Sequence, residues 1–275
     1  MVRIMKSHYE TVICPDCNSI ELLEVQHTFP HWTYFGYCSK CNCQITELLW
    51  KSNGHIWNDD MLNVLNKMKP SIPRLVVITD PPYGVRKEEE WDDATLYKNR
   101  IKIWLNECLR VADHTVVWFC ANRMFPHIFR SIEPSTFLRE HHWKKPKGSQ
   151  FAGASHNKIW YSTEPILVLT KNKEKTIRNF DEDAEWNYDD LEYDTIAKKV
   201  WNHPTIKPTG LITQLVQHYS KPGDTILDPF GGSGTLAEVA IKTGRNYIII
   251  EQDPQHYQTI LNRIKNINSQ TDLFR

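Results

Sequence analysis

The chain has 275 residues, of which 40% are hydrophobic and 24% charged, and its formal net charge is zero. A chain of this length can bury one sizeable core, or a catalytic domain with a small module. No apolar run approaches the ~18 to 20 residues that a membrane helix needs, and the start lacks a signal-peptide apolar region. We therefore expect a protein without a membrane partner, located in the cytoplasm or in a nucleus.

The cysteines are clustered near the start of the chain. Five of the seven lie within residues 14–43, and four of these form two C-x-x-C pairs with twenty residues between them. Such pairs are typical of a tetrahedral zinc site, because each tight knuckle points two thiolates the same way. We expect a zinc ribbon over residues 1–54 whose ligands are Cys14, Cys17, Cys38 and Cys41. Cys43 is a spare cysteine, and Cys108 and Cys120 are predicted to be core residues.

The first 52 residues alternate short β-like runs around the cysteine pairs, and residues 51–55 are predicted to be a linker. From residue 55 onward, helical patterns alternate with apolar strands, which predicts an α/β domain over 55–275 with a Rossmann-like, parallel sheet and helices on both faces. The predicted strands cover 74–79, 114–121, 164–170, 224–228 and 246–251. The predicted helices cover 60–68, 96–112, 209–219, 235–243 and 253–264, with a short one near 123–132. One face of the second helix carries Leu96, Ile101, Trp104, Leu105, Cys108 and Leu109.

Two motifs stand at predicted strand ends. The strand at 74–79 stops on Asp80, two prolines and Tyr83, and prolines hold the preceding residues extended and leave carbonyls free. The strand at 224–228 runs into a turn with glycines at 231, 232 and 234, and the next strand ends on Glu251. Glycines let a backbone approach a ligand closely, and a carboxylate there can bind ribose hydroxyls. The turn matches neither the dinucleotide nor the Walker pattern, so a nucleoside-type ligand is expected.

With these motifs the chain resembles the DNA amino-methyltransferases, which use S-adenosylmethionine to modify the exocyclic nitrogen of adenine or cytosine. The resemblance covers about residues 55–267. It rests on DPPY at 80, HPTIKP at 203, LDPFGGSGT at 227 and YIIIE at 247, with weaker matches near 57, 90 and 162. The catalytic motif precedes the cofactor motif, which is the permuted order of the family's β group.

The resemblance implies roles for both motifs. Asp80 and a carbonyl of the Pro81–Pro82 step would accept hydrogen bonds from the target amine, and Tyr83 would stack on the flipped base. Glu251 would bind the ribose, Asp60 the adenine and Lys207 the carboxylate of the cofactor. The expected cofactor-binding set is Asp60, Lys207, Asp228, Pro229, Phe230, Gly231, Gly232, Ser233, Gly234, Thr235 and Glu251. Two alternatives remain open, since Asp60 could instead cap a helix and Lys207 could be a surface lysine.

The expected DNA contacts lie in the basic segment 139–158, which has five Lys/Arg against one Glu. Lys144, Lys145 and Lys147 could follow a phosphate backbone, or form a solvated loop. The family's target-recognition region is represented by a short acidic insertion at about 171–200. We hypothesise that the zinc ribbon takes over part of the DNA contact through its aromatics at 27–37. It could equally dock another protein or only stabilise the chain, since residues 1–58 carry a net charge near −1.

The leading interpretation is methyl transfer to N6 of adenine in DNA, because Asp before PPY is the commoner adenine form in the family. Cytosine N4 is the alternative, since the motif suits both amines. An inactive relative that only binds nucleic acid, and a Rossmann-like oxidoreductase, are the competing classes. A homodimer or a partner subunit is left open.

Overall fold

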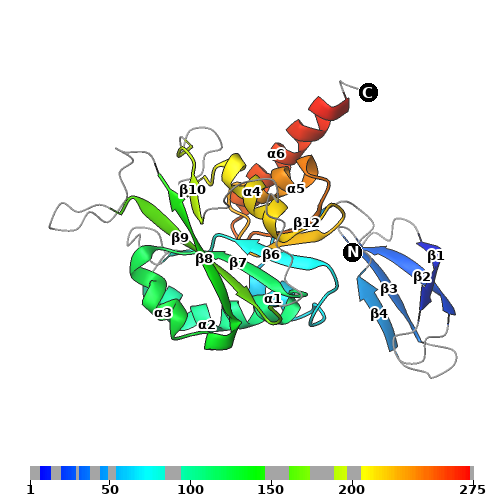
Figure 1. Ribbon diagram of the computed structural model, residues 1–275. Helices are drawn as coiled ribbons and strands as arrows, with labels where there is room; N and C mark the ends of the chain where they lie inside the picture. The colour runs from blue at the N-terminus through cyan, green and yellow to red at the C-terminus, as the bar shows by residue number, and fades with distance from the viewer. Residues whose placement is uncertain are drawn as a thin grey trace. The chain divides into compact units, whose positions relative to one another are not determined.

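The computed structural model describes residues 7–13, 20–28, 31–37, 44–48, 54–83, 94–145, 161–173, 189–196 and 206–272 of the chain, with side chains at 54–83, 98–145, 161–173, 189–196 and 206–267. The chain divides into two compact units, Met1–Asn53 and Gly54–Arg275 (Figure 1). Among the described helices, none combines the length and apolar character needed to cross a lipid bilayer.

The first unit is a four-stranded antiparallel sheet. Its strands β1 (Ser7–Ile13), β2 (Ile20–Thr28), β3 (His31–Tyr37) and β4 (Gln44–Leu48) pair in chain order. Ile13 pairs with Ile20, Tyr37 pairs with Gln44, and β2 pairs antiparallel with β3. The β1–β2 and β3–β4 connections therefore leave the same end of the sheet. The predicted zinc ligands Cys14, Cys17, Cys38 and Cys41 lie outside the described residues, within these two connections.

The second unit is built on an eight-stranded sheet, as the α/β pattern predicted. The strand order is β10 (Asp190–Glu192), β8 (Phe137–Lys144), β9 (Thr163–Thr170), β7 (Thr115–Phe119), β6 (Leu75–Thr79), β11 (Thr225–Asp228), β12 (Asn246–Ile250) and β5 (Gly54–Trp57). Of these described strands, β9 alone runs opposite to the others, because it pairs antiparallel with both β7 and β8. The prediction of a parallel sheet is therefore wrong for β9: the sheet is mixed, and the first residues of β9 lie at the edge where the other described strands end.

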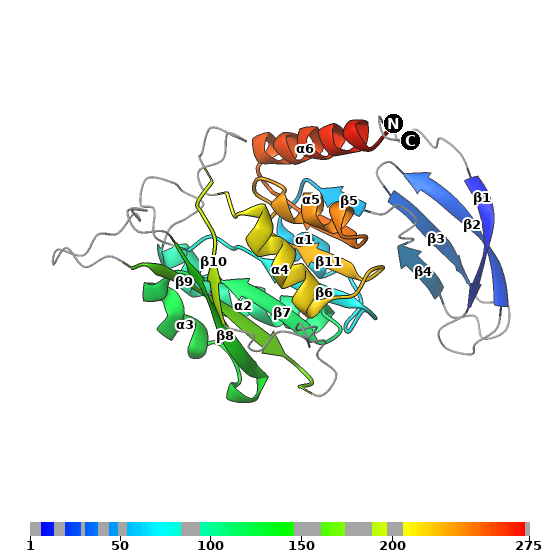
Figure 2. The same cartoon turned by 45° about the horizontal axis from the view of Figure 1, so that its top comes forward.

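Helices cover both faces of this sheet, as Figures 1 and 2 show. One face carries α4 (Thr209–Tyr219), α5 (Thr235–Lys242) and α6 (Pro254–Asp272), and the other carries α1 (Met61–Leu65), α2 (Ala94–Val111) and α3 (Phe125–Phe129). Short 3₁₀ helices cover Asn122–Met124 and Pro134–Thr136. This two-faced cover explains why the central strands are continuously apolar: all five residues of β6, and all five of β7, are buried.

The core contains the residues that the helical pattern of α2 selected. Ile101, Trp104, Leu105, Cys108 and Leu109 are all buried, whereas the side chain of Leu96 lies outside the described set. Cys120, at the end of β7, is likewise a free, buried cysteine, so the core prediction for both Cys108 and Cys120 is confirmed.

Three strands of the second unit differ from the sequence predictions. Gly54 and His55, expected in a linker, belong to β5, which pairs in parallel with β12. Residues 139–144 of the basic segment belong to β8, which begins at Phe137. Part of the acidic insertion forms β10, an edge strand that pairs in parallel with β8. The described part of this insertion is thus an extension of the sheet.

Candidate active site

Three carboxylates stand side by side at the carboxyl edge of the sheet. Asp80 follows β6, Asp228 ends β11 and Glu251 follows β12, and these three strands are neighbours. The hydroxyl of Thr79 donates to Oδ1 of Asp228 over 2.7 Å, which joins the end of β6 directly to the end of β11. The two predicted motifs therefore meet at one place, where open α/β sheets bind their ligands.

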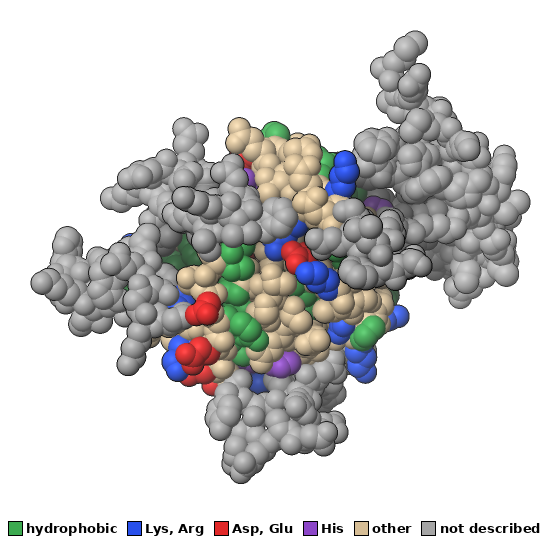
Figure 3. All heavy atoms as spheres, turned by 90° about the horizontal axis from the view of Figure 1, so that it is seen from above, with side chains coloured by type: hydrophobic (Ala, Val, Ile, Leu, Met, Phe, Trp, Pro, Cys, Tyr) green, Lys and Arg blue, Asp and Glu red, His purple; other side chains and the backbone are tan. Residues whose placement is uncertain are grey.

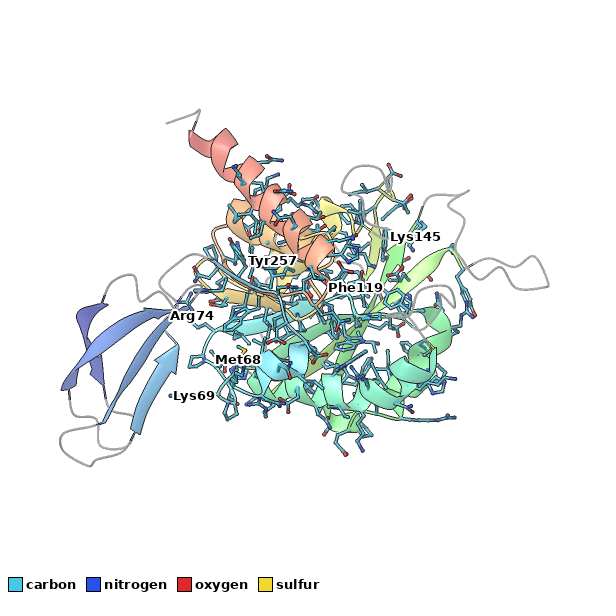
Figure 4. All side chains as sticks on the ribbon, turned by 180° about the vertical axis from the view of Figure 1, so that it is seen from behind. Met68, Lys69, Arg74, Phe119, Lys145 and Tyr257 are labelled. Atoms are coloured by element: carbon cyan, nitrogen blue, oxygen red, sulfur yellow. The ribbon has the colours of Figure 1, made fainter. Side chains whose placement is uncertain are left out.

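Figure 4 shows which end of the sheet this is. Arg74, which precedes β6, lies at one end with Met68 and Lys69, whereas Phe119 at the carboxyl end of β7 lies toward Lys145. The charged groups described next gather at the end marked by Phe119 and Lys145.

Asp80 is half-buried and its two oxygens have different partners. The hydroxyl of Tyr83 donates to Oδ1 over 2.5 Å, and the ammonium of Lys207 donates to Oδ2 over 2.6 Å. Burial raises the pKa of Asp80, and the positive charge of Lys207 opposes that rise. The carboxylate is thus fixed by two donors, and each oxygen keeps a lone pair for a further donor.

Lys207 is a buried residue, so the surface-lysine alternative is wrong. Only 8% of its side chain is exposed, and besides Asp80 its ammonium lies 3.2 Å from Glu164 Oε1. Burial would lower the pKa of Lys207, but the two carboxylates outweigh burial and raise it. In this structure its charge is turned toward Asp80 and Glu164.

Glu164 is a site residue that the sequence interpretation missed. It is the second residue of β9, and because β9 is reversed, this residue lies at the carboxyl edge of its neighbours. Glu164 accepts a hydrogen bond from Lys145 over 2.7 Å, and its Oε1 lies 2.5 Å from the Tyr83 hydroxyl, whose single proton it shares with Asp80. The available signal was a carboxylate at the start of an apolar run. Whether that carboxylate lies at the site depends on the direction of the strand, which the sequence does not determine.

The prediction for Lys145 is wrong. It was expected on an exposed loop in contact with phosphates, yet 5% of its side chain is exposed and its ammonium pairs with Glu164. Burial lowers the pKa of Lys145, against the pull of Glu164. Lys144 is exposed and pairs with Glu192 at 3.1 Å, so it keeps the accessibility that a phosphate contact needs. Lys147 lies outside the described residues.

The glycine-rich turn after β11 is shaped by what packs beneath it. A Cβ on Gly231 would lie 2.4 Å from a methyl of Ile249, and Gly234 adopts a left-handed conformation with φ of +74° against Ile260. These two glycines are needed because β12 and α6 fill the space that a side chain would take. Gly232, with φ of +51°, donates its amide to Glu251 over 2.7 Å.

Arg263 of α6 supports the same turn from inside. Its guanidinium, 2% exposed, contacts Glu238 at 2.6 Å and donates to the Ser233 carbonyl over 2.8 Å and to the Thr235 hydroxyl over 3.0 Å. The hydroxyls of Ser233 and Thr235 also lie 3.1 Å apart. Both of these predicted cofactor-binding side chains therefore take part in holding the turn.

Asp228 and Glu251 flank the turn in apolar surroundings. Burial raises the pKa of Asp228 to about 7, although its oxygen accepts from Thr79 and from the amide of Phe230. Burial also raises the pKa of Glu251, against the amides of Asp253 and Gly232 that donate to it. Asp228, predicted to need a partner because it ends a buried strand, has two.

The remaining predicted residues lie around this turn. Pro229 is buried and Phe230 is half-buried, with its ring edge-on to Trp104 at 5.0 Å and to Trp118 at 6.3 Å. Asp60 caps α1, since its Oδ1 accepts from the amide of Leu62 over 2.8 Å. The capping alternative for Asp60 is therefore confirmed, while its other oxygen faces Arg100 at 3.8 Å.

Comparisons with known proteins agree with this geometry. The profile of the DNA methylase family matches residues 75–262. The Type II methyltransferase M.HinfI of Haemophilus influenzae is 28% identical over 231 residues, which is 70% of this chain and 63% of the relative. M.HpaI of Haemophilus parainfluenzae is 27% identical over 216 residues, which is 69% of this chain and 67% of the relative. The chain thus spans about two thirds of these relatives.

Solved structures share the fold. The M1.HpyAVI–SAM complex superimposes with a TM-score of 0.58 at 23% identity, over 76% of this chain and 99% of that chain. The cytosine-N4-specific PvuII DNA methyltransferase gives a TM-score of 0.64 at 18% identity, over 78% of this chain and 91% of that chain. With a profile match that covers more than half of its residues, the chain belongs to the DNA methylase family.

Proposed function

We propose that this protein transfers a methyl group from S-adenosyl-L-methionine to the exocyclic amine of a base in DNA, with N6 of adenine as the favoured target. The observation that carries the proposal is the pairing of β6 with β11. It puts the Asp80 carboxylate beside the glycine turn, and the Thr79–Asp228 hydrogen bond holds the two strand ends together.

Asp80 has the chemistry that an exocyclic amine requires. The amine is a poor nucleophile because its lone pair is delocalised into the ring, so acceptors must localise that pair on nitrogen. Asp80 is fixed by Tyr83 and Lys207 before any substrate arrives, and a preorganised acceptor stabilises the positive charge that develops on nitrogen. A carbonyl of the Pro81–Pro82 step would be the second acceptor. S-adenosyl-L-methionine would supply the methyl group to this nitrogen, and Asp80 would accept the proton that the amine releases.

The glycine turn and its neighbours form the proposed cofactor site. The cofactor supplies an activated methyl group on a positively charged sulfur. Glu251, whose two oxygens each hold one amide, retains lone pairs for ribose hydroxyls. The half-buried ring of Phe230, supported by Trp104 and Trp118, would lie against the sulfonium end. Asp60 and Asp228 would complete the adenine and ribose contacts.

One further feature supports DNA as the substrate. Lys144 is exposed beside β10, and it would contact phosphate together with Lys147. Lys/Arg and Asp/Glu side chains both occur on the face shown in Figure 3, so the charge of its described residues is mixed. On this face, phosphate contact would therefore rest on individual lysines, since the described residues form no broad basic surface there.

We also propose that the first unit binds one structural zinc ion through Cys14, Cys17, Cys38 and Cys41. Support comes from its topology, since both cysteine-bearing connections leave the same end of the antiparallel sheet. Four thiolates carried there fit the tetrahedral geometry of zinc. Within the described residues there is no other group of potential metal ligands.

The proposed activity has a direct test. The protein is incubated with unmethylated genomic DNA and tritiated S-adenosylmethionine, the DNA is digested to nucleosides, and the labelled base is identified. Label in N6-methyladenine is the expected result. Label in N4-methylcytosine would keep the amine chemistry and change the target. DNA without label, from protein that binds the cofactor by calorimetry, would contradict the proposal.

A further inference from the structure

The proposed chemistry leaves one prominent feature unexplained, a largely buried cluster of charged residues that includes Asp80. It comprises Asp80, Glu164, Lys145, Lys207 and Tyr83. Glu164 is at its centre, because its Oε1 accepts from Tyr83 and faces Lys207, while its Oε2 accepts from Lys145. Each of these contacts is 3.2 Å or shorter. The members come from four separate segments, so the cluster is assembled only by the complete fold.

Exposure divides the two carboxylates. The side chain of Asp80 is 24% exposed, whereas that of Glu164 is 11% exposed and is covered by the lysines on both sides. A substrate amine could therefore approach Asp80, while Glu164 lies behind it. Asp80 is therefore placed to contact the substrate, whereas Glu164 can act on Asp80 only through Tyr83 and Lys207, which contact both carboxylates.

Aromatic rings enclose the two ammonium groups. The nitrogen of Lys207 lies 5.1 Å from the ring centres of Tyr83 and Phe119 and 5.8 Å from that of Trp143. The nitrogen of Lys145 lies 4.2 Å from the Trp143 ring. Ring faces attract cations and exclude water, so charges in the cluster act on one another more strongly than they would at the surface.

The cluster is electrically balanced when all its charged members are ionised. Asp80 and Glu164 supply two negative charges, and Lys145 and Lys207 supply two positive charges. Removing one partner of a buried pair leaves an uncompensated charge. The pKa values of the neighbouring groups then change in the direction that reduces this charge. Tyr83 contributes a single hydroxyl proton, for which the two carboxylates compete.

We propose, on the basis of the function proposed above, that Glu164 and Lys145 are positioning residues for Asp80: Glu164 holds Tyr83 and Lys207 against it, and Lys145 balances the charge that Glu164 brings. Neither residue needs to touch the substrate. Glu164 would hold the two donors of Asp80 in place, and Lys145 would favour the ionised, acceptor form of Asp80 in a site that is largely closed to water.

The groups that face Asp80 determine the sign of each expected effect. They are Lys207, Glu164, Tyr83, Lys145, Asp228 and, more remotely, the thiol of Cys120. The negative charge of Glu164 raises the pKa of Asp80, whereas the ammonium of Lys145 stabilises its ionised form. Replacing Glu164 by a neutral residue should lower the pKa of Asp80, and replacing Lys145 should raise it.

The test compares pH profiles of single-turnover methyl transfer at saturating DNA and cofactor. If ionised Asp80 is required, the rate rises with pH through an acid limb. Glu164→Gln is expected to lower the rate about 100-fold, because Tyr83 and Lys207 lose their fixed positions, and to move the acid limb to lower pH. Lys145→Met is expected to move the limb to higher pH, and Lys145→Arg, which keeps the charge, to restore the parent profile.

Matched controls separate this effect from general loss of charge. Glu192→Gln breaks the exposed counterpart pair with Lys144, and Lys221→Met removes an exposed lysine near the amino end of β11. Both are expected to leave the acid limb unchanged, because exposed charges are screened. Cofactor affinity measured by calorimetry should stay within about twofold in Glu164→Gln, since Glu164 has no contact with the glycine turn among its described contacts.

The outcomes distinguish this inference from the proposed function. If the parent protein methylates DNA but the acid limb moves in the same direction in both variants, or in neither, the positioning role is wrong. If the parent protein methylates no DNA, the proposed function fails first. Should Glu164→Gln not fold, the opposite behaviour of Lys145→Met and Lys145→Arg decides the question by itself.

Discussion

At the scale of single residues, Asp80 is the position on which the proposed chemistry depends. Its two oxygens are oriented by Tyr83 and Lys207, which come from separate parts of the second unit's sequence. The carboxylate therefore has its orientation before substrate binds. This makes the residue suitable for a conservative substitution, because an amide of the same shape keeps the packing and loses the charge.

We expect Asp80→Asn to reduce methyl transfer by about 1,000-fold, because an amide offers a single neutral acceptor to the target amine. Cofactor affinity should change little. The measurement is incorporation of tritiated methyl groups, beside calorimetry with S-adenosylmethionine, and Asp190→Asn on the exposed edge strand is the matched control. Transfer at the parental rate by Asp80→Asn would contradict the assignment of the acceptor.

Asp228 gives a prediction about stability. Its pKa of about 7 in the folded protein is above its ordinary value, so the folded state binds a proton that the unfolded state has lost. Stability from this group is complete at low pH and is lost as pH rises to about 7. Asp228→Asn mimics the protonated form, since its oxygen can still accept from Thr79.

We therefore expect Asp228→Asn to be more stable than the parent at pH 8, by on the order of 1–4 kcal/mol, and nearly equal to it near pH 4. Urea unfolding at several pH values would measure this difference. An unchanged difference between the two proteins across that range would show that Asp228 does not titrate there.

At the scale of elements, the sequence predicted the strands that are buried on both faces and the helix that has one apolar face. Strands β6 and β7 and helix α2 were found because both faces of a central strand, or one stripe of a helix, are apolar. Strand β8 was missed because its eight residues include five charged or histidine side chains and most are only half-buried. Strand β10 has three residues, too few for a pattern.

The sequence likewise identified some residues of the site and missed others. Asp80 and the glycine turn could be found because proline and glycine have local conformational meaning. Lys145 and Glu164 could not be placed, because their burial follows from the reversed direction of β9 and from their pairing with each other. A lone lysine or glutamate in a sequence is expected at the surface, and a buried pair is recognised only once the two strands are aligned.

Helix α6 is predicted to control the glycine turn through Arg263. Glu238 has two basic partners: the buried Arg263 and the exposed Lys242, whose side chain is 54% exposed. We expect Arg263→Met to cost about 3–5 kcal/mol of unfolding free energy, because Glu238 keeps a partly buried charge without its main partner, and to weaken cofactor binding. Lys242→Met should cost at most about 1 kcal/mol.

Denaturant unfolding and cofactor calorimetry on the two variants would check this contrast. Equal losses in Arg263→Met and Lys242→Met would mean that burial of the guanidinium has no special effect on the turn.

At the scale of the whole molecule, the two units are predicted to differ in what stabilises them. The first is a unit of 53 residues that contains a four-stranded sheet, and at this size a metal ion commonly supplies part of the folding free energy. We expect one zinc ion per chain by atomic spectroscopy. Chelation should unfold the first unit and leave the cofactor affinity of the second intact.

The spare cysteine offers a matched control for the zinc site. Cys17→Ser should release the ion, because three thiolates hold it more weakly than four, whereas Cys43→Ser should retain it. Loss of zinc from both variants to the same extent, or a parent chain without zinc, would contradict the predicted ligand set.

The position of β6 in the sheet also bears on how the chain reaches its final state during synthesis. Strand β6 is synthesised before its neighbour β11. The two strands are about 150 residues apart in the chain, since Thr225 pairs with Leu75. Until the ribosome has delivered β11, one edge of β6 has no strand beside it, and an open apolar edge is a site for misassembly. The catalytic and cofactor motifs can meet only after β11 has been synthesised, so a chain terminated before β11 could carry Asp80 but never use it.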